Sequence, residues 1–391
     1  MVVVSILMRL TVDTAMRMFY PFLPEISRGL GITLSQGGLL MSLRSAMIFT
    51  SPVFGSWSDR RGPRPMLMGA LLVQGISLWW LSTAYGLVAA IPPVILLGLS
   101  VSAFVPTLQA AISEQVPFHR RGRILGIVEF SWALTGLIVL PLVGLLMVQR
   151  GWQAPLRVVA VLSLAAAPLP ILFPHHPKRL GHIQHGLRQM AGMVWRIPSA
   201  RANIVVTGLM FVAAEAFFVT YGAWLEQGFR MAPNQIGRVA SLLGLAELSA
   251  SAASSLFIDR LGKRRGVGLG LIAMTATMAL LPLFERWQAL AIAGMFVFTV
   301  AFEFTIVSNI GLLSDQVPLA RGTVLAMAAM AGGVTRTVSD TLGVALFEWR
   351  GMQATAAYGV AGAALAAFVL YRWVQERGSE AEPVAGAIDG Q

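Results

Sequence analysis

The sequence predicts an all-α membrane protein with about twelve transmembrane helices in two pseudo-symmetric six-helix bundles. Its 391 residues are 56% hydrophobic and 12% charged, whereas a soluble domain carries about 25% charged residues. Apolar stretches long enough to cross a bilayer follow one another along the chain. A charged sequence motif in the first half recurs at the corresponding position of the second half, which indicates that a six-helix unit is duplicated.

Each predicted helix is a run of about 20 mostly apolar residues, bounded by a charge, a proline or a glycine. The first-half runs lie near 2–24, 35–57, 66–84, 88–112, 124–148 and 153–174. The second-half runs lie near 202–225, 236–258, 267–284, 288–313, 323–347 and 354–373. The opening run has no basic segment before it and no small-residue cleavage site after it, so we expect a retained helix and not a removed signal.

Basic residues gather in alternate connections between these runs. The formal charge of +11 therefore follows membrane topology rather than a nucleic-acid surface, because basic loops stay in the cytoplasm. We expect a multi-pass protein of the cell inner (plasma) membrane with both termini cytoplasmic. The basic residues are Arg60, Arg61, Arg64, Arg120, Arg121, Arg123, Lys178, Arg179, Arg188, Arg196, Arg260, Lys263, Arg264 and Arg265.

The chain divides into four parts. Residues 1–174 form an N-terminal six-helix bundle, and residues 201–373 form its C-terminal counterpart. The connection at 175–200 is a cytoplasmic linker that contains an amphipathic helix, because apolar residues from Ile183 to Val194 recur at helical spacing. Residues 374–391 are small and polar, which predicts a disordered tail.

The duplication is visible in several short sequence motifs. "SDRRGPRP" begins at Ser58 and "IDRLGKRR" at Ile258, while "SEQVP" at Ser113 matches "SDQVP" at Ser314. "RGWQA" at Arg150 likewise matches "RGMQA" in the second half. Matches spread over both halves at one offset predict two bundles related by an axis along the membrane normal.

In the first of these motifs the chain resembles the major facilitator superfamily, whose loop after the second helix has the consensus G-x-x-x-D-R-x-G-R-[KR]. The resemblance implies that the loop fixes topology and acts as a conformational latch. Pro63 replaces a usual arginine and Ser255 replaces the first glycine of the second copy. The latch candidates are Gly55, Asp59, Arg60, Gly62, Arg64, Asp259, Arg260, Gly262 and Arg264.

The fifth span is similar to the motif of the drug:proton antiporter branch of that family. Gly136, Pro141 and Gly144 fit the motif, but Leu140 stands in the place of a glycine. In another departure, Val94 occupies a position where proton-linked exporters often carry arginine. The resemblance favours export and leaves proton coupling to other charged groups.

Ionisable residues deep in the spans are not duplicated. None faces a charge at the equivalent position of the other half, although a charge at a helix centre costs about 2.5–3.5 kcal/mol. This asymmetry indicates function rather than scaffold. Together with Gln109, the predicted substrate- or proton-binding residues are Asp13, Arg17, Arg44, Glu129, Glu215, Glu247, Glu303, Arg336 and Asp340.

In the resembled fold, the first, fourth, seventh and tenth helices line a cavity, which implies that Asp13, Glu215 and Glu303 carry protons there. Arg17 would lie near the substrate with them. The residues expected to gate, on the helices between the halves, are Glu129, Glu247, Arg44, Arg336 and Asp340. An alternative is local ion pairing, because Asp13 and Arg17 lie four residues apart on one helix, as do Arg336 and Asp340. Arg9 lies closer to a helix end, from which its side chain is expected to snorkel to the surface.

Aromatic side chains complete the predicted pocket. Few Asn or Gln residues lie in the spans, which argues against a sugar site. An apolar pocket with few polar groups favours a lipophilic cargo. The candidates are Phe130, Trp132, Phe217, Phe218, Tyr221, Trp224, Phe302 and Phe304.

Other classes of protein lack support in the sequence. The chain has no cysteine, the histidines between 175 and 185 are typical of a solvated loop, and no phosphate-binding glycine motif or catalytic nucleophile is evident. We expect no enzyme, no cofactor and no metal.

The sequence thus predicts a monomeric secondary transporter that exports a lipophilic or amphipathic small molecule in exchange for protons. Its partners would be that molecule, protons and the lipid bilayer, with no nucleic acid. One alternative is an organic-anion or lipid transporter, in which Arg17, Arg44 and Arg336 hold the cargo. Another is a non-transporting receptor or assembly factor on the same scaffold.

Overall fold

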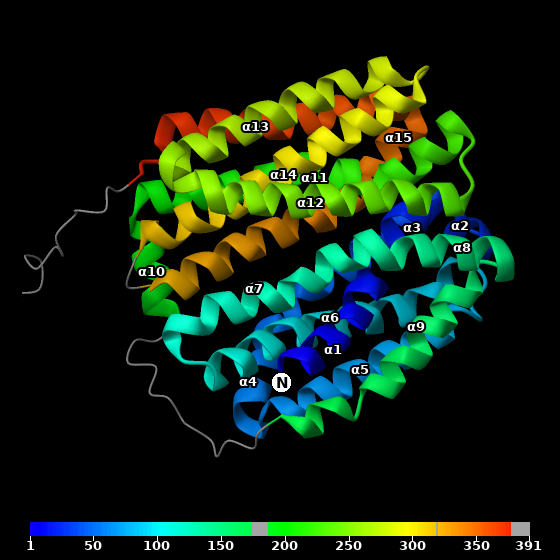
Figure 1. Ribbon diagram of the computed structural model, residues 1–391, viewed down its shortest axis with the longest axis horizontal. Coiled ribbons are helices and arrows are strands. Elements are labelled where there is room, and N and C mark those ends of the chain that lie inside the picture. The colour runs from blue at the N-terminus through cyan, green and yellow to red at the C-terminus, as the bar shows by residue number, and fades with distance from the viewer. Residues whose placement is uncertain (174–186, 318–319, 377–391) are drawn as a thin grey trace, which may run out of the picture.

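The computed structural model describes residues 1–173, 187–317 and 320–376. Helices dominate these residues and no strand occurs among them. The two halves of the chain form two bundles that lie one above the other in Figure 1, with the first half coloured blue to green and the second half green to red. Eight helices are long and apolar enough to cross a membrane by length and composition alone.

The first bundle follows the six predicted spans. Its elements are α1 (Val2–Arg17), α2 (Phe19–Leu30), α3 (Leu34–Ala46), η1 (Met47–Thr50), α4 (Ser51–Arg61), α5 (Pro63–Leu81), α6 (Leu87–Gln115), α7 (Phe118–Leu134), η2 (Thr135–Val139), α8 (Leu140–Arg150), α9 (Gln153–Ala166) and η3 (Leu169–Leu172). Four of the spans consist of several of these pieces in series: α1 with α2, α3 with η1 and α4, α7 with η2 and α8, and α9 with η3. Prolines accompany some of this irregularity. In α2, Phe22 leaves the helical conformation two residues before Pro24, which has no backbone N–H to donate to the helix.

The second bundle has fewer breaks. Its elements are α11 (Pro198–Phe229), α12 (Pro233–Leu261), α13 (Lys263–Leu280), η4 (Leu281–Phe284), α14 (Gln288–Gln316) and α15 (Arg321–Trp373), preceded by the short α10 (Leu187–Arg196). The long α15 contains two spans, because Arg350 and Gly351 leave the helical conformation and Gly351 has φ +63°. With this division the structure has about twelve spans in two bundles, as the sequence predicts.

The duplicated motif adopts the same turn in both halves. Gly62 ends α4 with φ +86°, and Gly262 ends α12 with φ +84°. A side chain is strained at such positive φ values, whereas glycine adopts them freely. The two glycines therefore have one structural role, which is to reverse the chain between consecutive spans.

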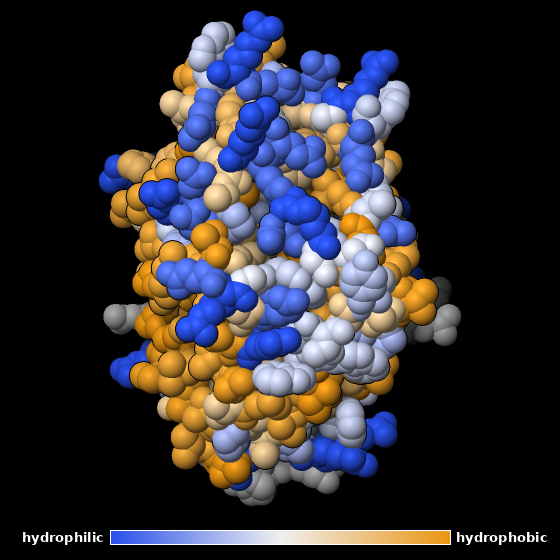
Figure 2. Space-filling view, turned by 90° about the vertical axis from the view of Figure 1, so that its right-hand side faces the viewer, coloured by the Kyte–Doolittle hydropathy of each residue, from blue (hydrophilic) through white to orange (hydrophobic). Residues whose placement is uncertain are grey.

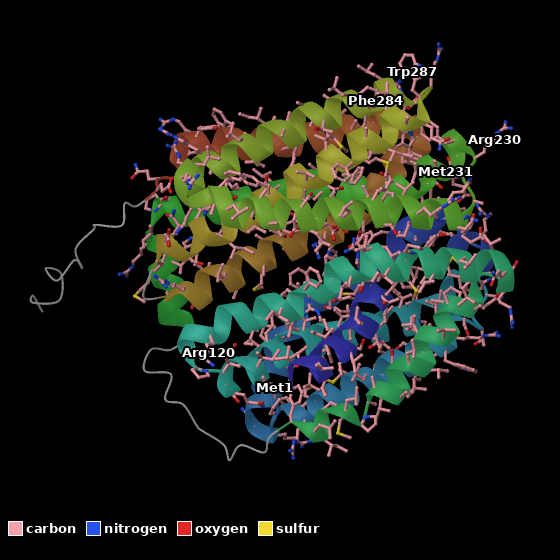
Figure 3. The ribbon with its side chains drawn as sticks, in the orientation of Figure 1. Met1, Arg120, Arg230, Met231, Phe284 and Trp287 are labelled. Atoms are coloured by element: carbon pink, nitrogen blue, oxygen red, sulfur yellow. The ribbon has the colours of Figure 1, made fainter. Side chains whose placement is uncertain are left out.

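The two ends of the molecule differ in how the bundles meet. We call the end with the α4–α5, α6–α7 and α12–α13 turns the basic end, and the end with the α2–α3, α8–α9 and α11–α12 turns the opposite end. Figure 3 places Met1 and Arg120 toward the basic end, and Arg230, Met231, Phe284 and Trp287 toward the opposite end. Figure 2 views the opposite end, where hydrophilic side chains are gathered over the middle and hydrophobic ones border them.

At the opposite end the bundles are in close contact. The packed pairs are α2 with α11, α3 with α15, and α8 with α12. A methyl group on Gly237 of α12 would lie 2.9 Å from the Leu140 carbonyl oxygen, and one on Gly38 of α3 would lie 2.8 Å from that of Asp340. These glycines allow the two backbones to approach each other directly, as small residues do in membrane bundles.

Toward the basic end this close packing is absent at the glycines described. A methyl group on Gly55 of α4, Gly126 of α7 or Gly322 of α15 would meet no atom within 4 Å. The interface is therefore closed at the opposite end and relaxed toward the basic end.

Candidate functional site

The first polar cluster, which we call the Arg9 network, lies within the first bundle. Arg9 Nε is 2.9 Å from Asp13 Oδ1, and Arg9 Nη2 is 2.8 Å from Glu129 Oε2. Ser131 Oγ donates to Asp13 Oδ2 at 2.6 Å, and Gln109 Nε2 donates to Glu129 Oε1 at 2.9 Å. The network thus joins the first, fourth and fifth spans.

Arg9 corrects a prediction. Its side chain does not snorkel to the surface but is 6% exposed, between two carboxylates. Arg9 stays inside the bundle because buried Asp13 and half-exposed Glu129, which is 120 residues away in sequence, both provide counter-charges. Only the packing of α1 against α7 brings the two groups together.

The second feature is an ion pair that crosses from one bundle to the other. Arg17 Nη1 and Nη2 each lie 2.8 Å from one oxygen of Glu247 on α12. Arg17 Nη1 also donates to the Trp132 carbonyl oxygen at 2.8 Å, and the guanidinium lies 4.6 Å from the centroid of the Trp132 ring. Both charged side chains are buried, and the bidentate geometry makes this the strongest type of arginine–carboxylate contact.

The third feature, which we call the Glu215 network, also joins the bundles. Tyr20 Oη of α2 donates to Glu215 Oε1 of α11 at 2.8 Å, and Arg336 Nε of α15 lies 3.4 Å from Glu215 Oε2. Ser45 Oγ of α3 donates to Asp340 Oδ2 at 2.6 Å. Glu215 and Asp340 are both buried and their carboxyl groups are close enough to interact.

Two arginines flank the Glu215 network. Arg44 Nη1 donates to the Met16 carbonyl oxygen at 3.0 Å, and its guanidinium lies over the ring of Phe19 at 5.3 Å. Arg336 lies 4.6 Å from the centroid of the Phe211 ring. Aromatic faces stabilise such cations away from water, so both guanidiniums are held in place by the protein itself.

Glu303 of α14 differs from the other carboxylates at the centre of the fold. Ser251 Oγ of α12 donates to Glu303 Oε1 at 2.9 Å. Among the described residues, no arginine, lysine or histidine forms an ion pair with it, and its side chain is half-buried. Ser251 lies one helical turn from Glu247, which places Glu303 one turn toward the basic end from the Arg17–Glu247 pair.

The local ion pairs considered from the sequence do not form. Arg17 pairs with Glu247 instead of Asp13, and Arg336 pairs with Glu215 instead of Asp340. The spacing of four residues allows a contact on one helix, but partners on neighbouring helices offer better geometry. Buried ion pairs depend on such geometry to offset desolvation.

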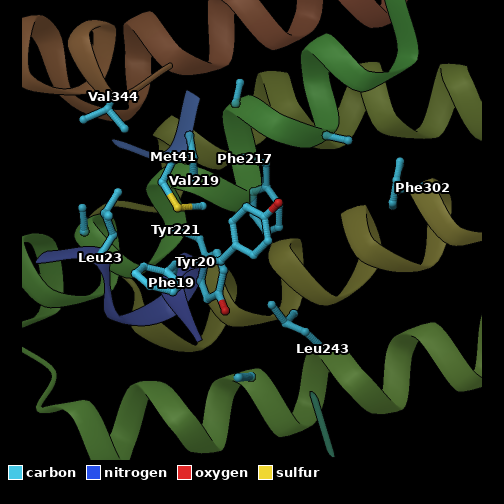
Figure 4. Packing of buried hydrophobic residues seen from close by; sticks show 14 of the residues in the cluster. Phe19, Tyr20, Leu23, Met41, Phe217, Val219, Tyr221, Leu243, Phe302 and Val344 are labelled. Atoms are coloured by element: carbon cyan, nitrogen blue, oxygen red, sulfur yellow. The ribbon is translucent and has the colours of Figure 1, made fainter. Parts of the chain in front are cut away.

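The predicted aromatic residues lie in different surroundings. Phe217, Tyr221 and Trp224 are fully buried in the core of the second bundle, as Figure 4 shows for the first two. Phe218 packs edge-on against Phe302 at 5.5 Å and lies 6.2 Å from Tyr20. Phe130 is 47% exposed on the surface.

The latch candidates are described only in part. Arg64 Nε donates to the Phe173 carbonyl oxygen at 3.0 Å, and Arg264 Nη2 donates to that of Tyr371 at 2.8 Å. Each arginine thus ties its turn to the last span of its own bundle. Arg60 and Arg260 are exposed. The side chains of Asp59 and Asp259 lie outside the described residues, so the latch remains a prediction.

Several residues of the site are not evident from the sequence. Tyr20, Ser45, Ser131 and Ser251 all donate hydrogen bonds to buried carboxylates. Hydroxyl residues are common in membrane helices, where most bond to their own backbone. Only Tyr20 carries a sequence signal, because it lies within one turn of Arg17.

Two bundles of six spans, joined by a buried ion pair across their interface, are typical of a secondary transporter. Comparison with known families supports the same class. The family model of the Major Facilitator Superfamily matches residues 6–221 and 204–388. The chain belongs to this family and is a transporter rather than an enzyme.

Individual relatives are distant. The chain is 23% identical over 327 residues to the uncharacterized MFS-type transporter YwfA of Bacillus subtilis, covering 82% of this chain and 79% of that protein. It is 25% identical over 268 residues to the multidrug resistance protein MdtG of Serratia proteamaculans, covering 64% of each chain. Just under two thirds of MdtG is therefore matched.

Solved structures share the fold. The D-xylose-proton symporter aligns with a TM-score of 0.80 and 16% identity, over 96% of this chain and 97% of that one. A point mutant of the nucleoside transporter NupG aligns with a TM-score of 0.75 and 15% identity, over 94% of this chain and 99% of that one. At these identities the likeness shows the architecture alone.

Proposed function

We propose that this transporter exports a lipophilic or amphipathic small molecule across the cell membrane in exchange for protons. The observation that carries the proposal is the buried Arg17–Glu247 pair, which joins the two bundles where the packed part of their interface ends. A scaffold that never moved would have little use for two buried charges there, since buried pairs seldom add stability over apolar residues.

Alternating access follows from the contacts between the bundles. With the basic end in the cytoplasm, as positive loops favour, the present conformation is closed to the outside. Opening the outside would separate α8 from α12 and α3 from α15, and it would break the bonds of Arg17 to Glu247 and of Tyr20 to Glu215. These contacts therefore act as an outer gate.

Glu303 is the best-placed proton carrier among the predicted candidates. Asp13 and Glu215 each have an arginine partner, whereas the partner of Glu303 among the described residues is the Ser251 hydroxyl. A carboxylate without a counter-cation gains more from taking up a proton. Its position beside the gate pair allows protonation to change the charge balance near Arg17 and Glu247.

The cargo class is supported by an aromatic surface and by the similarity to one relative. Phe211, Phe218 and Phe302 form edge-to-face contacts beside the Glu215 network. Flat apolar faces with few polar groups suit a lipophilic ligand. MdtG is named a multidrug resistance protein, which supports efflux as the direction.

Carriage of an organic anion is less well supported. Arg17 is occupied by Glu247, Arg336 by Glu215 and Phe211, and Arg44 by Met16 and the ring of Phe19. An anion would have to displace these partners one by one. A non-transporting receptor does not agree with the family to which the chain belongs.

Reconstitution into liposomes tests the proposal. An imposed pH gradient should drive accumulation of ethidium or rhodamine 6G by the wild-type protein, with proton movement followed by an internal pH dye. Glu303→Gln should reduce gradient-driven accumulation at least about tenfold, as loss of an essential proton-transfer group does. Glu114→Gln removes an exposed carboxylate of α6 and should leave it unchanged. Equal gradient-driven transport by wild type and Glu303→Gln would contradict the assignment.

A further inference from the structure

A cavity outside the candidate site lies in the first bundle, between α4, α5 and α6. Its volume is about 300 Å³, at the lower end of the range for small-molecule sites. Apolar residues form most of its wall, among them Phe54, Met66, Val73, Leu96 and Leu99. It begins at the basic end, where α4 meets α5, and extends toward the middle of α6.

The glycines near the basic end of α5 and of α13 differ in the space around them. A methyl group on Gly69 of α5 would meet no atom within 4 Å. On α13, a methyl group on Gly266 would lie 2.5 Å from Ile258 Cδ1 and 3.6 Å from Phe304 Cε1. The space beside Gly69 thus has no counterpart at Gly266.

The mouth of the cavity carries one cationic side chain. Arg61 is the last residue of α4, is exposed, and lines the cavity together with Trp57. Its guanidinium lies 5.1 Å from the centroid of the Trp57 ring. The tryptophan is itself 44% exposed. An arginine and a tryptophan at a span end are placed at the level of lipid headgroups.

We propose that the cavity binds one acyl chain of an anionic phospholipid from the leaflet on the basic side, with the phosphate against Arg61. The apolar wall matches a hydrocarbon chain, and the cation at the mouth matches the headgroup charge. Basic pockets between transmembrane helices commonly recognise anionic lipids in this way. The proposal is independent of the transported molecule, because the cavity shares no residue with the Arg9 network, the Arg17–Glu247 pair, the Glu215 network or Glu303.

Brominated lipids test the proposal directly, because bromine on an acyl chain quenches tryptophan on contact. The full-length protein would be reconstituted in phosphatidylcholine vesicles with increasing dibrominated phosphatidylglycerol or dibrominated phosphatidylcholine. The chain has 10 tryptophans, so the Trp57 signal is the difference between wild type and Trp57→Phe. One favourable arginine contact predicts about fivefold preference of this signal for the anionic lipid.

Two variants separate the cavity from general attraction to the membrane. Arg61→Gln should reduce the ratio of Trp57 quenching by the anionic lipid to quenching by phosphatidylcholine to near one. Gly69→Leu, which fills the cavity, should reduce this ratio in the same way without changing the charge. Arg120→Gln removes an exposed positive charge of α7 at the same end and should keep the full preference. Equal quenching of the Trp57 signal by the two lipids, or an unchanged preference in Arg61→Gln, would overturn the proposal.

Discussion

The two ends of the interface between the bundles are built differently. At the opposite end, glycines of one bundle touch the backbone of the other, and hydrogen bonds and ion pairs cross between them. Toward the basic end, glycines of α4, α7 and α15 have no close neighbour. The inter-bundle contacts thus gather at one end in this conformation, as they must in a transporter closed on one side.

The contacts at the closed end are themselves unequal. Arg17 and Glu247 are buried, whereas Arg28 and Glu226, which also pair across the bundles, are partly exposed. Breaking an arginine–glutamate pair should therefore reduce stability strongly at the centre of the interface and weakly at its rim.

Breaking the central pair should have the largest effect. Arg17→Gln leaves Glu247 buried without its counter-charge, which should cost about 3–5 kcal/mol of stability in this conformation. Thermal unfolding of the purified protein, followed by tryptophan fluorescence, measures the loss. The double variant Arg17→Gln with Glu247→Gln should recover part of it. Losses that simply add in the double variant would show that the two residues do not interact.

A bulky residue at a close glycine should have the next largest effect. In Gly237→Leu the new side chain meets the backbone of Leu140 and Pro141, and overpacking of this kind costs about 1–3 kcal/mol. Gly126→Leu, where a methyl group meets no atom, should not change unfolding by more than about 0.5 kcal/mol. Similar destabilisation by both variants would remove the distinction between the two ends.

The rim pair should have the smallest effect. Glu226→Gln removes the partner of Arg28 across the interface, but Arg28 also contacts Glu25 on its own helix. Exposed pairs contribute about 0–1 kcal/mol, so the unfolding temperature should hardly change and transport should persist. A loss as large as that of Arg17→Gln would place the main gate contact at the rim instead.

Much of the fold could be predicted from the sequence, because the thickness of the bilayer sets the length of each span and charged residues mark the turns between spans. Gly62 and Gly262 could be identified as turns since their neighbours repeat, and the spans follow from runs of apolar residues. Breaks within spans, such as that after Arg17, have no comparable signal. They arise from packing against a second helix and from proline positions whose effects differ with context.

The members of the site were largely predictable, but their partners were not. The cost of a charge in hydrocarbon singles out Asp13, Arg17, Glu247 and Glu303 without any structure. Spacing on one helix suggested Asp13 as a partner for Arg17, yet the partner is Glu247, 230 residues away. Such pairing depends on how two bundles dock, which a single sequence does not specify.

Paired distance measurements would report on the motion of the two bundles itself. Because the chain lacks cysteine, spin labels can be introduced in pairs at Arg150 and Arg230 for the opposite end, and at Arg120 and Arg260 for the basic end. All four residues are exposed. Lowering the pH or adding a transported dye should lengthen the first distance while the second shortens. Two distances that stay fixed, or that change in the same direction, would contradict alternating access by rocking of the two bundles.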